Sequence, residues 1–119
     1  MADAALFIRW GETQSGRERK SVELFGESMR FLTKLVEEGR VASVEPFFLE
    51  PHGGDLEGFF LVRGELEELA AIRISDEFQA LAVRAQVVVS GFGVIGAKTG
   101  EMLNKHMAWF AEAAKRAEE

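Results

Sequence analysis

The stretch that most constrains the fold runs from Leu56 to Ile95. It contains a short apolar run, Gly58–Arg63, a segment of helical character from Glu65 to Ala85, and a second apolar run, Val87–Ile95. Short apolar runs rich in β-branched and aromatic residues are typical of strands, and apolar residues spaced by three and four are typical of helices. This part of the chain therefore predicts a strand, a helical region and a second strand.

The first part of the chain has the same order of elements between Ala5 and Leu49. The strand Ala5–Trp10 precedes a helix from about Arg17 to Glu38, and a strand from Val41 to about Leu49 follows. The sequence Pro51-His52-Gly53-Gly54-Asp55 is a strong turn signal, so the second and third strands are predicted to form a hairpin. Two strand–helix–strand units joined in this way give the α+β order βαββαβ, the split βαβ or ferredoxin-like arrangement.

Residue patterns also predict where some strands lie in the sheet. The strands Ala5–Trp10 and Gly58–Arg63 are apolar on both faces, so they are expected inside the sheet, covered on both sides. Pro46 cannot donate a ladder hydrogen bond, which favours an edge or a bulge for the second strand. The glycines of the strand Val87–Ile95 favour an edge or a strong twist.

Three helical features carry further expectations. Gly26, in the middle of the first helix, costs about 1 kcal/mol against alanine, and we interpret it as a site of close backbone packing. Ser75 is expected to cap a second piece of the helical region after Glu65. A last helix, from about Thr99 or Gly100 to Ala117, has a wide apolar band, which predicts contact with another subunit.

Composition excludes several classes of protein. The 119 residues favour one domain, 1–119, with a core at about 5–96 and a C-terminal helix at about 99–117. The net charge of -6 disfavours nucleic acid and anionic membranes as partners, because both need a positive surface. The absence of cysteine excludes disulfides, thiolate catalysis and cysteine-ligated metals. No apolar run approaches the roughly 20 residues of a membrane span, and the start of the chain lacks signal-peptide features, so a soluble cytoplasmic protein is expected.

The order and lengths of these elements resemble the dimeric α+β barrel superfamily, nearest to its YCII-like and other uncharacterised small members. The features that carry the resemblance are the strand Phe59-Phe60-Leu61-Val62, the divided helix around Ser75–Phe78 and the closing strand Val87–Ile95. The resemblance implies a four-stranded antiparallel sheet in the order 4-1-3-2, two helices on one face, and a homodimer whose sheets meet through their other faces. Superfamily members include cofactor-independent monooxygenases, haem-degrading enzymes and lactone isomerases, so membership does not specify a function. No cofactor is carried over, and His52 and Asp55 do not align with the His–Asp pair of YCII-like proteins.

Two motifs point weakly to chemistry. Residues 91–96 match G-x-G-x-x-G, but a dinucleotide fingerprint needs a second strand ending in an acid about 20 residues later, and only one helix follows. His52 and His106 have no histidine or cysteine at ligand spacing, so no metal site is predicted. His52 is a weak candidate for general acid–base work, on the suitability of imidazole alone.

Strand alternation predicts where a ligand would bind. Phe7 and Arg9 share one face of the first strand, and Phe59, Leu61 and Arg63 share one face of the third. If both sets face the partner subunit, Arg9 and Arg63 can hold a carboxylate or enolate oxygen while the rings bury the rest of the ligand. The opposite parity is physically open, and strand-end arginines more often reach water or form ion pairs.

Three classes of function follow from these residues. The first is a homodimer that binds a small aromatic or carbonyl compound between sheet and partner, which includes cofactor-independent enzymes; Arg9, Arg63 and His52 are then the weak catalytic candidates. The second is a non-catalytic oligomeric or regulatory protein whose cavity is filled by its own aromatic side chains. Nucleotide binding through Gly91–Gly96 is the third.

Overall fold

The computed structural model describes residues 2–118. Along these residues the chain forms β1 (Ala4–Trp10), α1 (Glu18–Glu37), β2 (Ser43–Phe48), β3 (Gly58–Gly64), α2 (Leu66–Arg73), α3 (Asp76–Val88), β4 (Gly93–Lys98) and α4 (Gly100–Ala117). The predicted βαββαβ order is therefore confirmed, with the second helical region divided as expected. Ser75 caps α3, since its hydroxyl accepts a hydrogen bond from the Phe78 amide at 3.3 Å.

The strands form one antiparallel sheet in the order β2-β3-β1-β4. This is the expected order 4-1-3-2 read from the opposite edge. The strands that are apolar on both faces, β1 and β3, lie in the middle of the sheet as expected, but helices cover only one of their two faces. The strand that contains Pro46, β2, lies at one edge, as its missing N–H requires, and β4 lies at the other.

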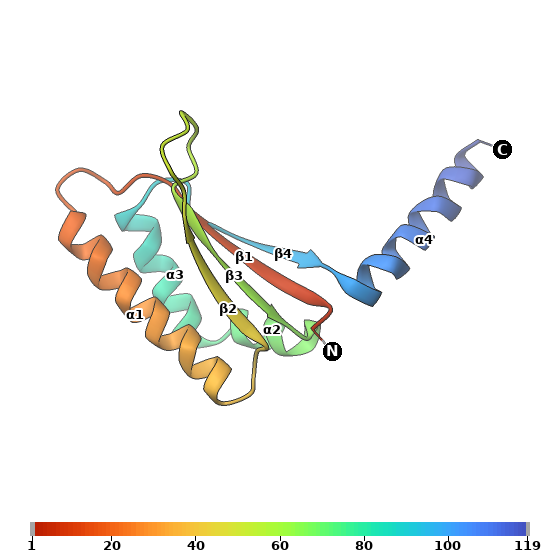
Figure 1. Cartoon of the computed structure of the whole chain (residues 1–119), viewed down its shortest axis with the longest axis horizontal. Helices are drawn as coiled ribbons and strands as arrows, with labels where there is room; N and C mark the ends of the chain where they lie inside the picture. The colour runs from red at the N-terminus through yellow and green to blue at the C-terminus, as the bar shows by residue number, and fades with distance from the viewer. Residues whose placement is uncertain (1, 119) are drawn as a thin grey trace.

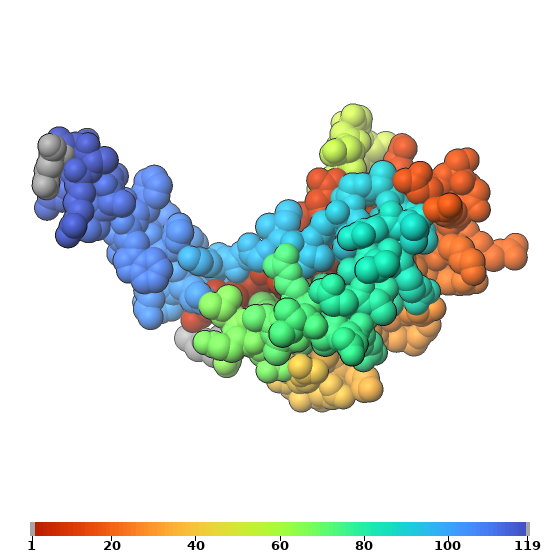
Figure 2. Space-filling view, turned by 180° about the vertical axis from the view of Figure 1, so that it is seen from behind, coloured from red at the N-terminus to blue at the C-terminus, as the bar shows by residue number. Residues whose placement is uncertain are grey.

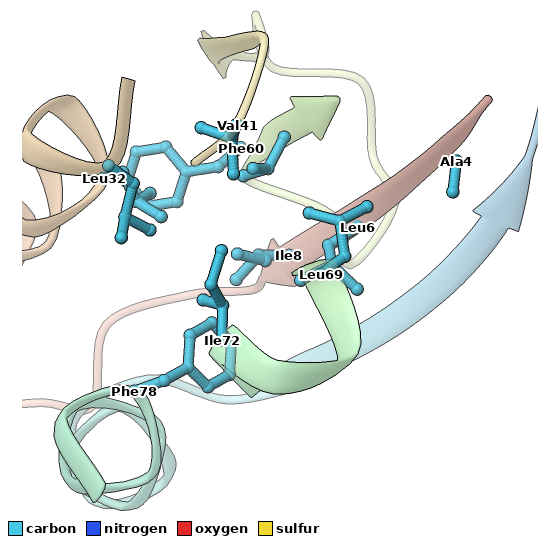
Figure 3. Close-up of a cluster of buried hydrophobic side chains, with 11 residues drawn as sticks. Ala4, Leu6, Ile8, Leu32, Val41, Phe60, Leu69, Ile72 and Phe78 are labelled. Atoms are coloured by element: carbon cyan, nitrogen blue, oxygen red, sulfur yellow. The ribbon is translucent and has the colours of Figure 1, made fainter. Parts of the chain in front are cut away.

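The helices α1, α2 and α3 cover one face of the sheet (Figure 1). The core lies between these two layers (Figure 3) and contains Leu6, Ile8, Phe60 and Val62 of the sheet with Leu32, Leu35, Leu69, Ile72 and Phe78 of the helices. Because successive side chains of a strand alternate between faces, the residues between these positions point to the other side of the sheet. No helix of the described residues covers that other side (Figure 1).

The predicted start of the fourth strand is wrong. Val87 and Val88 belong to the last turn of α3, and β4 begins only at Gly93. The valine run favours a strand by propensity, but Ala85 and Val89 are both buried, and a spacing of four places both on the core side of a helical turn. Gly91, at φ +59, then turns the chain towards β4. Tertiary packing has therefore overridden local preference.

The interpretation of Gly26 as a close-packing site is also wrong. A Cβ at this position would meet only Arg30 Nη1, at 3.5 Å, which is ordinary contact. Gly26→Ala is therefore expected to raise the free energy of unfolding by about 0.5–1 kcal/mol, because alanine loses less backbone entropy in a helix.

Chemical denaturation of both proteins would measure this gain. Gly39→Ala is the matched control with the opposite sign. Gly39 follows α1 at φ +73 with open space around it, so alanine there should cost about 1 kcal/mol through backbone strain alone. Equal destabilisation by both changes would contradict the assignment of Gly26.

The helix α4 leaves the end of β4 and extends away from the layer formed by α1 and α3 (Figure 1). None of its residues is buried, and its exposed apolar residues include Leu103, Met107, Trp109 and Phe110. In Figure 2 a hollow lies between α4 and the hairpin loop of residues 49–57, with β4 along its floor. No helix within residues 2–118 has the length and apolar character that crossing a membrane requires.

Candidate functional site

The uncovered side of the sheet, which we call the open sheet face, is the first candidate site. Residues paired across neighbouring strands share a face, so the register identifies its members. They are Ala5, Phe7 and Arg9 of β1, Ser43, Glu45 and Phe47 of β2, Phe59, Leu61 and Arg63 of β3, and Gly93, Ile95 and Ala97 of β4. The structure therefore places Phe7, Arg9, Phe59 and Arg63, the predicted ligand-binding residues, on one face.

Aromatic rings form the centre of this face. The ring of Phe59 lies 4.6 Å from Phe7 and 4.8 Å from Phe47, centroid to centroid. Phe47 is 41% exposed and Ile95 is 51% exposed. A contiguous apolar surface of this kind, at the middle of a sheet, is typical of an interface or a binding surface.

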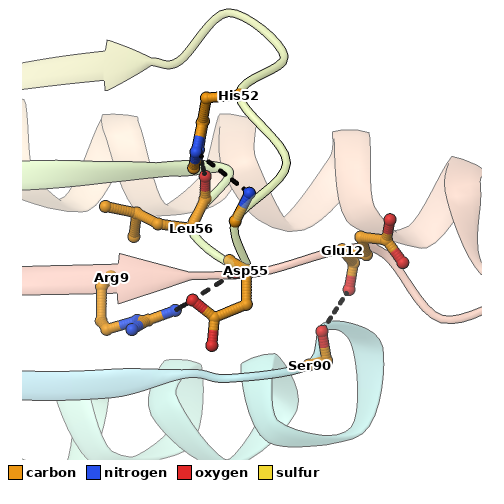
Figure 4. A network of polar contacts seen from close by, with 7 residues as sticks. Arg9, Glu12, His52, Asp55, Leu56 and Ser90 are labelled. Atoms are coloured by element: carbon orange, nitrogen blue, oxygen red, sulfur yellow. Dashed lines mark hydrogen bonds and ion pairs between the residues drawn. The ribbon is translucent and has the colours of Figure 1, made fainter.

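Arg9 lies at the end of the open sheet face nearest the hairpin loop. Its Nη2 donates a hydrogen bond to the Asp55 carbonyl at 3.3 Å and lies 3.8 Å from the Asp55 carboxylate (Figure 4). Its Nε is buried and has no hydrogen-bond partner among the described residues. A guanidinium normally satisfies its donors in a forked geometry, so the buried Nε of Arg9 is one donor left without an acceptor.

Arg63 has a different environment at the opposite end of the face. Its Nε donates to Glu45 Oε1 at 3.3 Å, which is the structural ion pair considered for this residue. The register pairs Arg9 with Phe59, four positions from Arg63 along β3, or about 13 Å at the usual rise of a strand. The two guanidinium groups share a face but do not converge on one small ligand.

His52 is occupied within its own loop. Its Nδ1 accepts a hydrogen bond from the Gly54 amide at 3.2 Å, and its Nε2 lies 2.7 Å from the Leu56 carbonyl (Figure 4). The neutral tautomer with hydrogen on Nε2 satisfies both contacts. In this arrangement the imidazole stabilises the hairpin loop, and neither nitrogen is directed to a substrate.

A cavity of about 250 Å³, which we call the helix-side cleft, lies on the other side of the sheet between α1 and α3. The chain has ten phenylalanines and two tryptophans, and seven of these aromatic residues line the cleft. They are Trp10, Phe25, Phe31, Phe48, Phe60, Phe78 and Phe92. Trp10 packs against Phe25, Phe48 and Phe60 with ring centroids 6.0, 6.1 and 5.0 Å away.

Glycine makes room for the indole of Trp10. Gly58 lies directly opposite Trp10 in the sheet, and a Cβ on it would lie 2.7 Å from Trp10 Cζ2 and 2.5 Å from the Phe47 carbonyl oxygen. A larger residue at this position would displace the ring that forms the floor of the cleft.

Hydrogen-bonded pairs of polar side chains lie at two places around the cleft. Thr13 Oγ1 donates a hydrogen bond to Ser21 Oγ at 2.9 Å, and both residues line the cleft. Arg84 of α3 forms a bidentate pair with Glu27 of α1, which ties the two helices together beside the cleft. The hydrogen bond from Arg84 lowers the pKa of the Glu27 carboxyl.

The aromatic residues in the strands and next to them divide between the two sites. Trp10, Phe48, Phe60 and Phe92 line the helix-side cleft. Phe7, Phe47 and Phe59 belong to the open sheet face instead. Strand alternation signals this division, because neighbouring residues such as Phe59 and Phe60 must point to opposite faces.

Several cleft residues have no signal in the sequence. Phe25, Phe31 and Phe78 sit in helical stripes typical of any core, and Thr13, Ser21 and Ser28 are ordinary polar residues. Only the packing of α1, α3 and the sheet around one space makes them the walls of a cavity. Within residues 2–118 no group of three or more histidine, cysteine or acidic residues is arranged to hold a metal ion.

No protein-family model matches the sequence, and no curated protein is significantly similar to it. Among solved structures, the fold is similar to a dimeric protein of unknown function with a ferredoxin-like fold from Bacteroides fragilis. The TM-score is 0.57, and the match covers 80% of this chain and 95% of that chain at 7% sequence identity. At this identity the similarity supports the fold and nothing finer: the chain has a ferredoxin-like α+β fold.

Proposed function

We propose that this protein is a homodimer of the dimeric α+β barrel type, akin to YCII-like proteins, that binds a small aromatic anion or carbonyl compound between the open sheet face and the partner subunit. The observation that carries the proposal is the open sheet face itself, with its rings at the centre, Arg9 at one end and no covering helix in the described residues. The dimeric state of the Bacteroides fragilis protein, which has the same fold, supports it. The cytoplasm is the location that we propose, on the sequence grounds above.

The dimensions of the surface favour an interface that includes α4. Four strands of about six residues cover roughly 19 by 20 Å. This footprint of about 400 Å² is half of the roughly 800 Å² that each partner buries in a standard interface. The exposed helix α4, about 27 Å long, adds a second apolar surface next to it. A second copy seated in the hollow between α4 and the hairpin loop would cover both.

The chemistry of Arg9 defines the class of ligand. The guanidinium of Arg9, with one donor left unsatisfied, suits a carboxylate or a polarised carbonyl oxygen, and the rings of Phe7 and Phe59 suit an aromatic body. In a cofactor-independent reaction the same guanidinium would stabilise an enolate oxygen. Arg63 is already paired with Glu45, so we assign it to structure.

Arg9→Ala is expected to weaken binding of 2-naphthoate, used as an aromatic anion, at least tenfold. The reason is the loss of a charge-assisted hydrogen bond, which contributes about 1.5–3 kcal/mol. Isothermal titration calorimetry on the wild-type and variant proteins would measure the change. Circular dichroism and sedimentation should show fold and dimer intact.

Arg63→Ala is the matched control, because it removes the same side chain from the same face and should leave 2-naphthoate affinity within about twofold. Arg9→Lys separates charge from geometry, since lysine keeps the charge but not the forked donors. Equal affinity in the wild type and Arg9→Ala, or loss of the dimer in Arg9→Ala, would remove Arg9 from the site.

A second candidate function is a non-catalytic oligomer with a closed aromatic core. The stacking of Phe47 on Phe59, with planes inclined by 23°, favours it, because rings already packed together leave less room for a ligand. A dimer that binds neither 2-naphthoate nor related carbonyl compounds would support this alternative over the first.

A further inference from the structure

We infer that the helix-side cleft is a second binding site, separate from the open sheet face, for a small uncharged aromatic compound. The two sites lie on opposite faces of the sheet. The inference goes beyond the proposed function and does not depend on it, because every residue that lines the cleft belongs to one chain.

The size of the cleft limits the size of its ligand. Its volume of about 250 Å³ exceeds the roughly 150 Å³ of an apolar cavity that holds benzene. It is smaller than the roughly 300–1,000 Å³ of sites for drug-sized ligands. A compound of two fused rings, or one ring with a short substituent, fits between these limits.

The charge of the lining selects uncharged compounds. Among the described residues that line the cleft, Glu57 alone is charged, and a carboxylate there repels anions. The aromatic rings supply an apolar wall on which a flat ring can stack. The ligand of the cleft therefore differs in charge from the anion that Arg9 would hold on the opposite face.

A hydroxyl pair gives the cleft one polar recognition point. Ser21 Oγ accepts the hydrogen bond from Thr13 Oγ1, so the hydroxyl hydrogen of Ser21 can be donated to a ligand oxygen. Since both hydroxyls can also accept, they suit a phenolic or alcoholic hydroxyl or a ketone oxygen. A mostly apolar wall with a few converging polar groups is the usual composition of a small-molecule site.

Small residues on both helices keep the cleft open. Ser28 projects from α1, and Ala82 and Ala85 project from α3, all into the lining. Larger apolar residues at these positions would fill the space, and filling a cavity usually stabilises a protein. The Glu27–Arg84 pair and the contact of Phe31 with Phe78, at 6.4 Å between ring centroids, join the helices around this space.

A titration with 2-naphthol, followed by NMR of ¹⁵N-labelled protein, tests the inference. The chain has two tryptophans, so Trp109→Phe assigns the remaining indole N–H signal to Trp10 in the cleft. We expect a saturable shift of this signal with a dissociation constant in the micromolar to sub-millimolar range. Ala82→Leu should weaken binding at least tenfold by filling the cleft.

Ala80→Leu is the matched control on the same helix, because Ala80 is exposed and does not line the cleft. It should leave the affinity unchanged. If Ala82→Leu fails to fold, Ser28→Val on α1 is the substitute variant. It also fills the cleft and should weaken 2-naphthol binding. Arg9→Ala should leave 2-naphthol binding intact while it weakens 2-naphthoate, so failure of one site is distinguishable from failure of the other.

Three results would overturn the inference. The first is the absence of a saturable Trp10 shift. The second is unchanged affinity in whichever of Ala82→Leu and Ser28→Val folds. The third is a Trp10 signal that moves with protein concentration instead of with 2-naphthol, which would show that another copy of the chain occupies the cleft.

Discussion

Leu61→Lys is expected to turn the proposed homodimer into a folded monomer, with a dissociation constant at least about 100-fold higher than that of the wild type. Leu61 lies at the middle of the open sheet face, directly opposite Phe7 on one side and Glu45 on the other. In the monomer the new ammonium group lies beside Glu45, a favourable pair across strands. In the dimer this ammonium group would be removed from water against apolar surface while Glu45 is already paired with Arg63, and such an incompletely compensated buried charge costs about 3–5 kcal/mol.

Sedimentation velocity at micromolar concentration would measure this change. Leu66→Lys is the matched control, since Leu66 is 47% exposed and belongs to α2, in the helix layer on the other side of the sheet. It should remain dimeric. A wild-type protein that is monomeric at this concentration, or a Leu61→Lys protein that still dimerises, would refute the interface on the open sheet face.

Ile72→Ala is expected to lower the free energy of unfolding by about 2–5 kcal/mol, a large share of the roughly 5–15 kcal/mol of a typical domain. Ile72 is 1% exposed and is one of the two largest fully buried side chains among the described residues. It lies in α2 among Ile8, Leu69 and Phe78 of the core (Figure 3). Alanine leaves a cavity that these neighbours fill only in part.

Differential scanning calorimetry at one fixed protein concentration should show a Tm lower by at least about 10 °C. The concentration must be held constant because the proposed dimerisation would make Tm depend on it. Ile74→Ala removes the same atoms two residues later, where the side chain is 77% exposed, and should change stability by less than about 0.5 kcal/mol. Similar losses in both variants would mean that α2 does not pack as described.

The order of elements and the inner or edge positions of strands were predictable from local patterns. Runs apolar on both faces marked β1 and β3 as central strands, and Pro46 marked β2 as an edge. These features can be predicted from the sequence because each depends on one segment and its immediate neighbours. The 4-1-3-2 order itself came from a family resemblance, and the structure has that order.

Predictions from local patterns were wrong where the outcome depends on packing between segments that are distant in the chain. The valine run after Ala85 has strand propensity, yet its first residues form the last turn of α3. The reason is that Ala85 and Val89, one helical turn apart, are both buried on the core side. The presence of Gly26 in α1 was attributed to close backbone packing, but no close neighbour lies beside it. Both errors come from the same cause: propensity describes a segment alone, whereas burial depends on what lies against it.

By itself, the sequence determined the alternation of strands and helices, the hairpin at residues 51–55, and the membership of Phe7 with Arg9 and of Phe59 with Arg63 on common strand faces. Only the tertiary structure decided that both pairs lie on the uncovered side and that Arg63 binds Glu45 while the Nε of Arg9 has no acceptor. It also decided that a cavity lies among α1, α3 and the sheet. The physical reason is that side chains alternate along a strand. This alternation assigns them to two opposite faces, but it does not specify which face the helices cover. Cavities and ion pairs depend on distances between segments far apart in the chain, which no local pattern contains.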